Sequence, residues 1–144
     1  MPTKKREQMG EVRVRVRLSS ATDVESAKKG LIDPETVRSC EVEALVDTGA
    51  TKSVIPPDIA DRLGLTILRQ TLGKLADGSR IPAGLSSAIL FEMYDRATVE
   101  GAYVLGDEVL IGQTVLESMD LLVDCPNRRV IPNPAHPEGP VLRL

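Results

Sequence analysis

The stretch EALVDTGATKSVIP, from Glu43 to Pro56, differs from an ordinary surface turn. A mostly apolar segment leads into a single carboxylate, Asp47, and apolar residues resume at Val54 and Ile55. A buried strand seldom ends on a carboxylate, because burying an unsatisfied charge costs free energy. The stretch therefore predicts a buried loop that presents Asp47 upward from the core, where the carboxylate either has donors around it or shares a proton.

The three residues after Asp47 are suited to a turn that faces a ligand. Thr48 offers a short hydroxyl for local or cross-chain hydrogen bonds, and Gly49 lets backbone N–H groups approach the carboxylate. Ala50 is small enough for a ligand to come close. The alternative is an Asx-turn, in which Asp47 only accepts a hydrogen bond from its own turn. A bare Asp-Thr-Gly favours that alternative, but the apolar residues on both sides weaken it here.

Length and composition indicate one globular domain. The chain has 144 residues, of which 42% are hydrophobic and only 2% aromatic, so aliphatic side chains must build the core. The net charge of −3 argues against nucleic acid as the main partner. No apolar run reaches the length of about 18 residues that a membrane span requires, so no membrane partner is expected. The charged start MPTKKREQMG lacks the apolar segment of a secretory signal, and we expect a cytoplasmic protein.

Alternation along the chain predicts an all-β fold. In EVRVRVRLS, residues 11–19, aliphatic residues alternate with three arginines, which is typical of a strand with one buried and one solvated face. We interpret the row of Arg13, Arg15 and Arg17 as the solvated face rather than as a basic binding surface. Asp77-Gly78 is a strong signal for a hairpin turn.

The other segments are assigned from their patterns. We expect a long loop over 20–40 with room for a short turn of helix, strands at 40–47, 84–93 and 97–105, short helices near 57–63 and over 113–119, and a final hairpin that turns at Pro126-Asn127. By domain, we expect a frayed or disordered terminus over 1–9, the folded domain over 10–132 and an extended Pro-rich tail over 133–144.

Three motifs in this order resemble the retropepsin-like aspartic proteases, the single-domain type known from retroviruses. That group has an apolar-apolar-Asp-Thr-Gly-Ala loop, which is similar to Leu45-Val46-Asp47-Thr48-Gly49-Ala50 here. Its glycine-turned flap hairpin is matched by LADGS at 75–79, and its apolar-apolar-Gly segment before a helix by Leu110-Ile111-Gly112. The resemblance covers residues 10–132 and depends on the order of the motifs, because the Asp-Thr-Gly triplet alone is weak evidence.

The resemblance implies a retropepsin-like closed β-barrel or sandwich with one or two short helices, acting as a C2 homodimer. The chain has one Asp-Thr-Gly, which is half a site. In the family, two carboxylates about 3 Å apart share one proton and activate water, so Asp47 would act with its symmetry mate. The resemblance also implies supporting residues: Thr48, Gly49 and Ala50 in the active-site loop, Ala76, Asp77 and Gly78 in a flap over an extended peptide, and Ile111 and Gly112 in a structural loop under the site.

Some features depart from the viral members of the family. The loop over 20–40 is longer, the flap tip Asp77-Gly78 replaces a Gly-rich apolar tip, and the tail beyond residue 132 is additional. The chain therefore looks more similar to the cellular and bacterial members than to the viral ones.

The implied function is an aspartic endopeptidase acting on peptides or proteins, and two alternatives with the same fold stay open. One is a non-catalytic dimeric module that binds peptides, and the other is a dimerisation domain without a ligand. No cofactor or metal is expected, because His136 is the only histidine and the cysteines do not cluster. Ser53 lacks a histidine partner for a catalytic triad. We expect Cys40 and Cys125 to be free thiols, although the sequence also allows a disulfide between them.

Overall fold

The structure is a computed structural model that describes residues 10–144, so the frayed terminus expected over 1–9 lies outside the described residues. Its strands are β1 (Arg13–Ser20), β2 (Ser39–Val46), β3 (Val54–Ile55), β4 (Ile67–Lys74), β5 (Arg80–Ser86), β6 (Ile89–Met93), β7 (Arg96–Glu100), β8 (Tyr103–Val104), β9 (Leu110–Ile111), β10 (Leu121–Asp124) and β11 (Arg129–Pro132). The helices are α2 (Ala21–Lys28), the 3-10 turn η1 (Pro34–Thr36), α3 (Pro57–Arg62) and α4 (Gln113–Met119).

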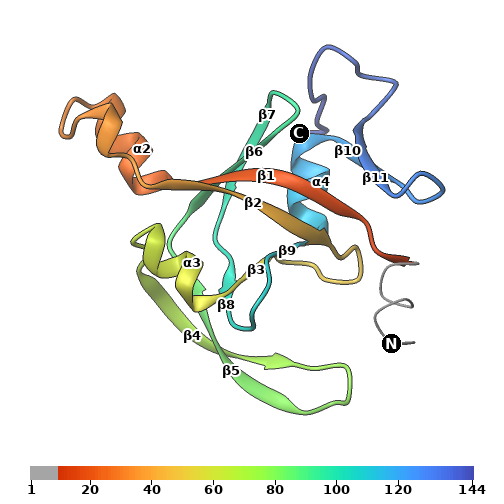
Figure 1. Cartoon of the computed structure of the whole chain (residues 1–144), viewed down its shortest axis with the longest axis horizontal. Helices are drawn as coiled ribbons and strands as arrows, with labels where there is room; N and C mark the ends of the chain where they lie inside the picture. The colour runs from red at the N-terminus through yellow and green to blue at the C-terminus, as the bar shows by residue number, and fades with distance from the viewer. Residues whose placement is uncertain (1–9) are drawn as a thin grey trace.

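One curled sheet dominates the molecule, which confirms the all-β expectation (Figure 1). Its strand order is β4-β5-β8-β3-β9-β2-β1-β6-β7, and β10 and β11 form a separate two-stranded hairpin. Within the described chain β4 and β7 do not pair with each other, so the sheet forms a half-barrel, whereas we expected a closed barrel or sandwich. The β4–β5 hairpin projects away from the body of the half-barrel (Figure 1).

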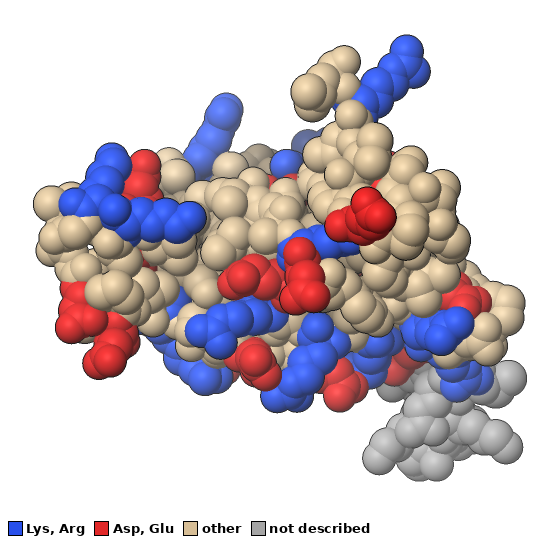
Figure 2. All heavy atoms as spheres, turned by 90° about the horizontal axis from the view of Figure 1, so that it is seen from above, with Lys and Arg blue, Asp and Glu red and all other residues tan. Residues whose placement is uncertain are grey.

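β1 has the alternation that its sequence predicts. The side chains of Val14, Val16 and Leu18 are buried in the core, whereas the arginines between them are exposed. Those arginines pair with glutamates on the neighbouring strands: Arg15 Nε lies 3.3 Å from Glu41 of β2. Figure 2 shows a face on which basic and acidic side chains intermingle instead of separating into a patch of one sign. The arginine row is therefore a solvated face with ion pairs across strands.

The segment 20–40 is more ordered than the loop we expected, since it holds both α2 and η1. The hydroxyl of Ser20 caps α2 by accepting a hydrogen bond from the Asp23 backbone N–H at 3.2 Å. The buried carboxylate of Asp23 accepts hydrogen bonds from Arg38, at 3.0 Å from its backbone N–H and at 2.8 Å from its side chain. These bonds from Arg38 hold the pKa of Asp23 below its ordinary value. A polar helix is thus fixed by hydrogen bonds rather than by an apolar stripe.

Two expected strands, 84–93 and 97–105, are each broken into two. The first expected strand breaks after Ser86 and the second at Gly101, and hydrogen bonds join the two breaks. Ser86 N–H donates to the Ala102 carbonyl at 2.9 Å, and Ala102 N–H donates to the Ser86 hydroxyl at 3.1 Å. A side chain on Gly101 would come within 2.6 Å of the Ser86 carbonyl oxygen. The chain changes strand partners here, since β5 pairs with β4 and β8 whereas β6 pairs with β1 and β7. Alternation along the sequence does not reveal this change.

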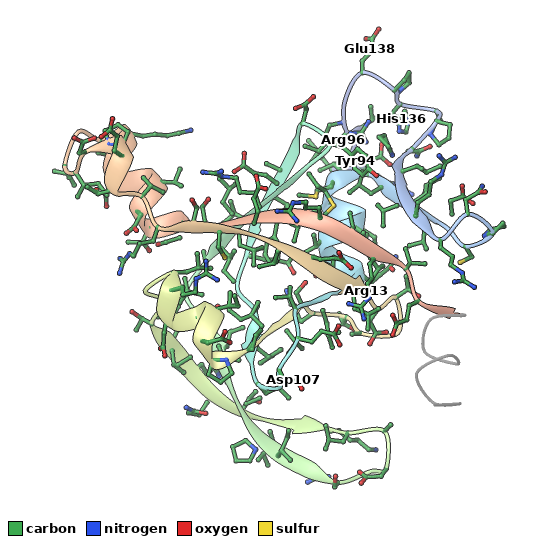
Figure 3. The ribbon with its side chains drawn as sticks, viewed as in Figure 1. Arg13, Tyr94, Arg96, Asp107, His136 and Glu138 are labelled. Carbon is green, nitrogen blue, oxygen red and sulfur yellow. The ribbon has the colours of Figure 1, made fainter. Side chains whose placement is uncertain are left out.

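The C-terminal tail folds back on the body, although we expected it to be extended. Arg96, which is 4% exposed, donates to the carbonyl oxygens of Met119, Asp120 and His136. The carboxylate of Asp120 also contacts the ring nitrogen of His136 at 2.5 Å and accepts from the Val141 backbone N–H at 3.2 Å. Figure 3 shows Arg96 and His136 together where the tail meets the strands. Arg96 and Asp120 therefore tie the tail to the C-terminal end of α4.

The charge of Asp120 should contribute to stability in a limited pH range. The Asn133 amide, which donates to Asp120 at 3.0 Å, is the main cause that lowers the pKa of Asp120 to about 2. Because the pKa of Asp in an unfolded chain is about 3.9, the ionised carboxylate stabilises the fold above about pH 4, and this contribution is lost as the pH falls through about 2. We expect Asp120→Asn to be less stable than the wild type at neutral pH, with a difference that shrinks as the pH falls below 4. Urea unfolding of both proteins across this range measures the difference, and a constant difference would contradict the prediction.

Candidate active site

Asp47 leaves the sheet where β2 and β9 pair in parallel. The register aligns Leu45 with Leu110 and Val46 with Ile111. The backbone N–H of Asp47 continues this ladder, because it donates to the Ile111 carbonyl at 2.9 Å. The side chain of Ile111 is fully buried in the core. The main chain at Asp47 is therefore fixed by the sheet before its side chain makes any contact.

The loop after Asp47 is tied to the start of α4 by further backbone bonds. Gln113 N–H donates to the Ala50 carbonyl at 2.8 Å, and Thr114 N–H donates to the Thr51 carbonyl at 3.1 Å. These bonds also satisfy N–H groups in the first turn of α4, which have no partners inside the helix. The structure thus brings the expected active-site loop and the expected structural loop into direct contact.

The closest contact between the two loops lies at Gly112. A Cβ atom there would come 2.5 Å from the carbonyl carbon of Lys52 and 2.9 Å from the backbone nitrogen of Ser53. The φ angle of Gly112 is −88°, which any residue can adopt, so the position requires glycine for space rather than for backbone freedom. The Ser53 hydroxyl accepts a hydrogen bond from Gly112 N–H at 2.9 Å and is completely buried. Ser53 therefore supports the site through its hydroxyl, a role that is not evident from its position in the sequence.

The side chain of Asp47 is half-exposed, so the expectation of a buried carboxylate is wrong for the single chain. Its Oδ1 atom accepts a hydrogen bond from Gly49 N–H at 3.0 Å, which is the Asx-turn that we considered as the alternative. Thr48 and Gly49 are exposed, and the Thr48 hydroxyl has no hydrogen-bond partner within residues 10–144. The tip of the loop therefore presents a carboxylate and a free hydroxyl to the outside of the chain.

Asp47 lines a cavity of about 510 Å³ between the half-barrel and the β4–β5 hairpin. Its other walls are mostly apolar. From the body of the fold come Val54, Tyr103, Leu105 and Leu110, and from the hairpin come Leu72, Leu75, Ala76 and Ile81. Such a cavity, with few polar groups among apolar walls, is typical of a ligand site.

The expected flap residues divide into two roles. Ala76 lines the cavity with Asp47, whereas Asp77 and Gly78 do not and instead form the turn at the tip. Gly78 has a φ angle of 87°, which favours glycine. Asp77 accepts a hydrogen bond from the Ser79 backbone N–H at 2.8 Å, and its bonds with Ser79 hold the pKa of Asp77 below its ordinary value. Asp77 is therefore occupied within its own turn.

The described residues contain no group of three or more His, Cys, Asp or Glu that could hold a metal ion. Among the same residues, no helix is long and apolar enough to cross a membrane. Cys40 is buried and Cys125 is exposed, and both are free thiols.

Residues 34–88 match a family model described as aspartyl protease. This segment contains Asp47 and the β4–β5 hairpin but ends before Gly112. A comparison with curated proteins found no match.

A comparison with solved structures found proteases and a protease-like domain among the matches. The retroviral protease-like domain of Ddi1 from Leishmania major is 16% identical with a TM-score of 0.52, over 86% of this chain and 89% of that one. A retropepsin-like aspartic protease from Rickettsia conorii is 15% identical with a TM-score of 0.44, over 80% of this chain and 76% of that one. EIAV protease complexed with the inhibitor HBY-793 is 20% identical with a TM-score of 0.44, over 54% of this chain and 75% of that one.

The family model and the Leishmania structure confirm the resemblance to retropepsin-like proteases that the motifs indicated. The model covers the loop of Asp47, and the structural match extends over most of the chain.

Gly112 gives a test of the contact between the two loops. Gly112→Ala would place a methyl group against the backbone of Lys52 and Ser53, which cannot move without breaking the loop that carries Asp47. We expect a loss of more than about 2 kcal/mol in the free energy of unfolding, measured with urea. The control is Gly10→Ala, since a Cβ atom at Gly10 would meet nothing within 4 Å. Equal stabilities of the two variants would show that the contact is looser than described.

Proposed function

We propose that the chain is an aspartic endopeptidase that becomes active as a homodimer, with Asp47 of each copy in one shared site. The observation that carries the proposal is the position of Asp47: its backbone is held by β9, and its side chain lies at an apolar cavity below a projecting hairpin. The chain contains a single Asp-Thr-Gly, so a pair of carboxylates requires a second copy.

The chemistry follows from two carboxylates in close contact. Like charges about 3 Å apart cannot both remain ionised, so the pair holds one proton between them. The ionised partner accepts a proton from a water molecule, which attacks the peptide carbonyl, while the protonated partner donates to the carbonyl oxygen. The bond from Gly49 N–H to Asp47 at 3.0 Å orients one carboxylate oxygen and leaves the other for water.

The exposure of the active-site loop supports a dimer. Thr48 is exposed with an unused hydroxyl in the described chain, and Asp47 is half-exposed. In the proposed dimer, Thr48 donates to the loop of the other copy and removes both carboxylates from bulk water. The loops then enclose a site that the single chain leaves open.

The β10–β11 hairpin is the proposed second part of the interface. It is a separate two-stranded sheet, and such a hairpin is marginally stable by itself. Leu121 and Val130 are buried against the body, whereas Leu122 on the other face is 45% exposed. Pairing of this hairpin with its symmetry mate would cover Leu122 and the open strand edge.

A substrate would lie extended along the cavity, under the β4–β5 hairpin. Extended peptides bind through main-chain hydrogen bonds beside strand edges, with alternate side chains in pockets. The apolar walls supplied by the hairpin and the body suit apolar side chains next to the scissile bond. In this arrangement the hairpin is a flap that excludes water during reaction.

The first test removes the carboxylate. Asp47→Asn is nearly isosteric and keeps an acceptor for Gly49 N–H, but an amide cannot share the proton. We expect kcat/KM on a peptide library to fall by at least about 1,000-fold, while sedimentation shows an unchanged dimer.

A matched control is Asp95→Asn, an exposed aspartate in the β6–β7 turn away from the cavity. Binding of a statine-type inhibitor to Asp47→Asn separates loss of chemistry from loss of the site. Residual activity near that of the wild type would overturn the mechanism, and binding without cleavage by the wild type would favour a peptide-binding module instead.

The second test concerns the interface. Leu122→Asp places a charge at the proposed contact, and C2 symmetry introduces it twice. We expect the dimer dissociation constant to rise by about 10-fold to 100-fold, with activity lost at low protein concentration and regained at high concentration. Sedimentation and activity against concentration measure both effects.

Leu31→Asp is the control, because Leu31 is 73% exposed and follows α2, at the end of the molecule away from β10 (Figure 1). If Leu122→Asp dimerises as tightly as the control variant, another surface forms the interface.

A further inference from the structure

The cavity next to Asp47 is lined by two further carboxylates from the body of the fold. The loop between β8 and β9 carries Asp107 and Glu108, and both residues line the cavity. Figure 3 shows Asp107 where this loop points toward the β4–β5 hairpin. The two carboxylates are adjacent in sequence, but their surroundings differ.

Glu108 is neutralised from outside the cavity. Its Oε1 atom accepts a hydrogen bond from Arg13 Nη1 at 2.7 Å, and the same guanidinium contacts Glu11 at 3.0 Å. The bond to Glu108 is the main cause that raises the pKa of Arg13 above its ordinary value. Because Arg13 pairs with the Glu108 carboxylate, little of the negative charge of Glu108 is left to attract a ligand.

Asp107 lacks such a partner. It is exposed, and within residues 10–144 its carboxylate makes no hydrogen bond or ion pair. The neighbouring walls are apolar, with Leu105 on the same loop and Leu110 and Tyr103 on the flanking strands. A ligand group that fits here has a long apolar stem and a positively charged end.

Among the side chains of proteins, those of Arg and Lys have this form, since they bury an aliphatic stem while the charged head stays near water. On the basis of the proposed function, we infer that this site selects peptides with Arg or Lys beside the scissile bond, and that Asp107 binds the cationic end. Asp107 is then the specificity-determining residue, while Asp47 performs the chemistry.

Lys74 carries the opposite charge on the other side of the cavity and would favour an acidic substrate residue. Its ammonium sits at the end of a flexible stem on the projecting hairpin, so a contact with it must order the side chain and the hairpin together. Asp107 has a short side chain on a loop between two paired strands, and it loses less freedom on binding. Asp47 adds negative potential on the same side, whereas the charge of Glu108 is offset by Arg13. The cavity therefore favours a basic residue.

The test compares three peptides that differ only at the residue beside the cleaved bond: Arg, norleucine or Glu. We expect the wild type to prefer Arg over norleucine by about fivefold in kcat/KM, as for a partly exposed ion pair. In Asp107→Asn this ratio falls to about one, because the stem contacts remain but the charge is gone. Asp107→Lys inverts the order of Arg and Glu. The ratio within each variant is the readout, so a general change in activity cancels.

The control variant Asp95→Asn removes an exposed carboxylate elsewhere and should keep the wild-type ratio. The same peptides with a reduced, non-cleavable bond are also measured for equilibrium binding to the wild type and to Asp107→Asn.

Cleavage without a preference for Arg, a preference for Glu, or a preference that survives Asp107→Asn overturns this inference and leaves the proposed function standing. Binding that prefers Arg through Asp107 without any cleavage supports this inference and overturns the proposed function. If the peptides are neither cleaved nor bound, both are overturned.

Discussion

The contact between Gly112 and the backbone of Lys52 and Ser53 organises the candidate site. It places two loops that are distant in sequence so close that no side chain fits between them. Ser53 satisfies the Gly112 N–H in the interior, and Ile111 satisfies the N–H of Asp47. The direction of the carboxylate is therefore set by main-chain geometry, which is more rigid than a side chain held by packing alone.

The same geometry explains why one hydrogen bond is compatible with both interpretations of Asp47. An Asx-turn through Gly49 stabilises the loop in a single chain, where water solvates the rest of the carboxylate. In the proposed dimer, the same bond holds the carboxylate in place as water is displaced. In that proposal, a turn that is structural in the single chain would serve two copies without a rearrangement of the loop.

Local patterns predicted the elements that depend on local physics. Alternation identified β1, Asp77-Gly78 identified the hairpin turn, and the pattern after Gly112 identified α4. Patterns failed where distant groups decide the structure. α2 has no apolar stripe and depends on the bonds of Ser20 and Asp23, and the bond from Gly112 to Ser53 joins segments that no sequence period relates. The anchoring of the tail by Arg96 likewise needs three carbonyl groups that meet only in the fold.

The parallel pairing of β2 with β9 has a consequence for the order of biosynthesis. A nascent chain that has emerged only as far as β8 contains Asp47, the β4–β5 hairpin and most of the sheet, but it lacks β9, the strand between β2 and β3. Its Asp47 N–H has no carbonyl partner, and its Ser53 hydroxyl has no amide to accept from. The site loop is thus completed only after residues 109–114 have left the ribosome. Pairing between such distant segments is also slow to form, so the site loop stays incomplete until β9 is available to pair with β2.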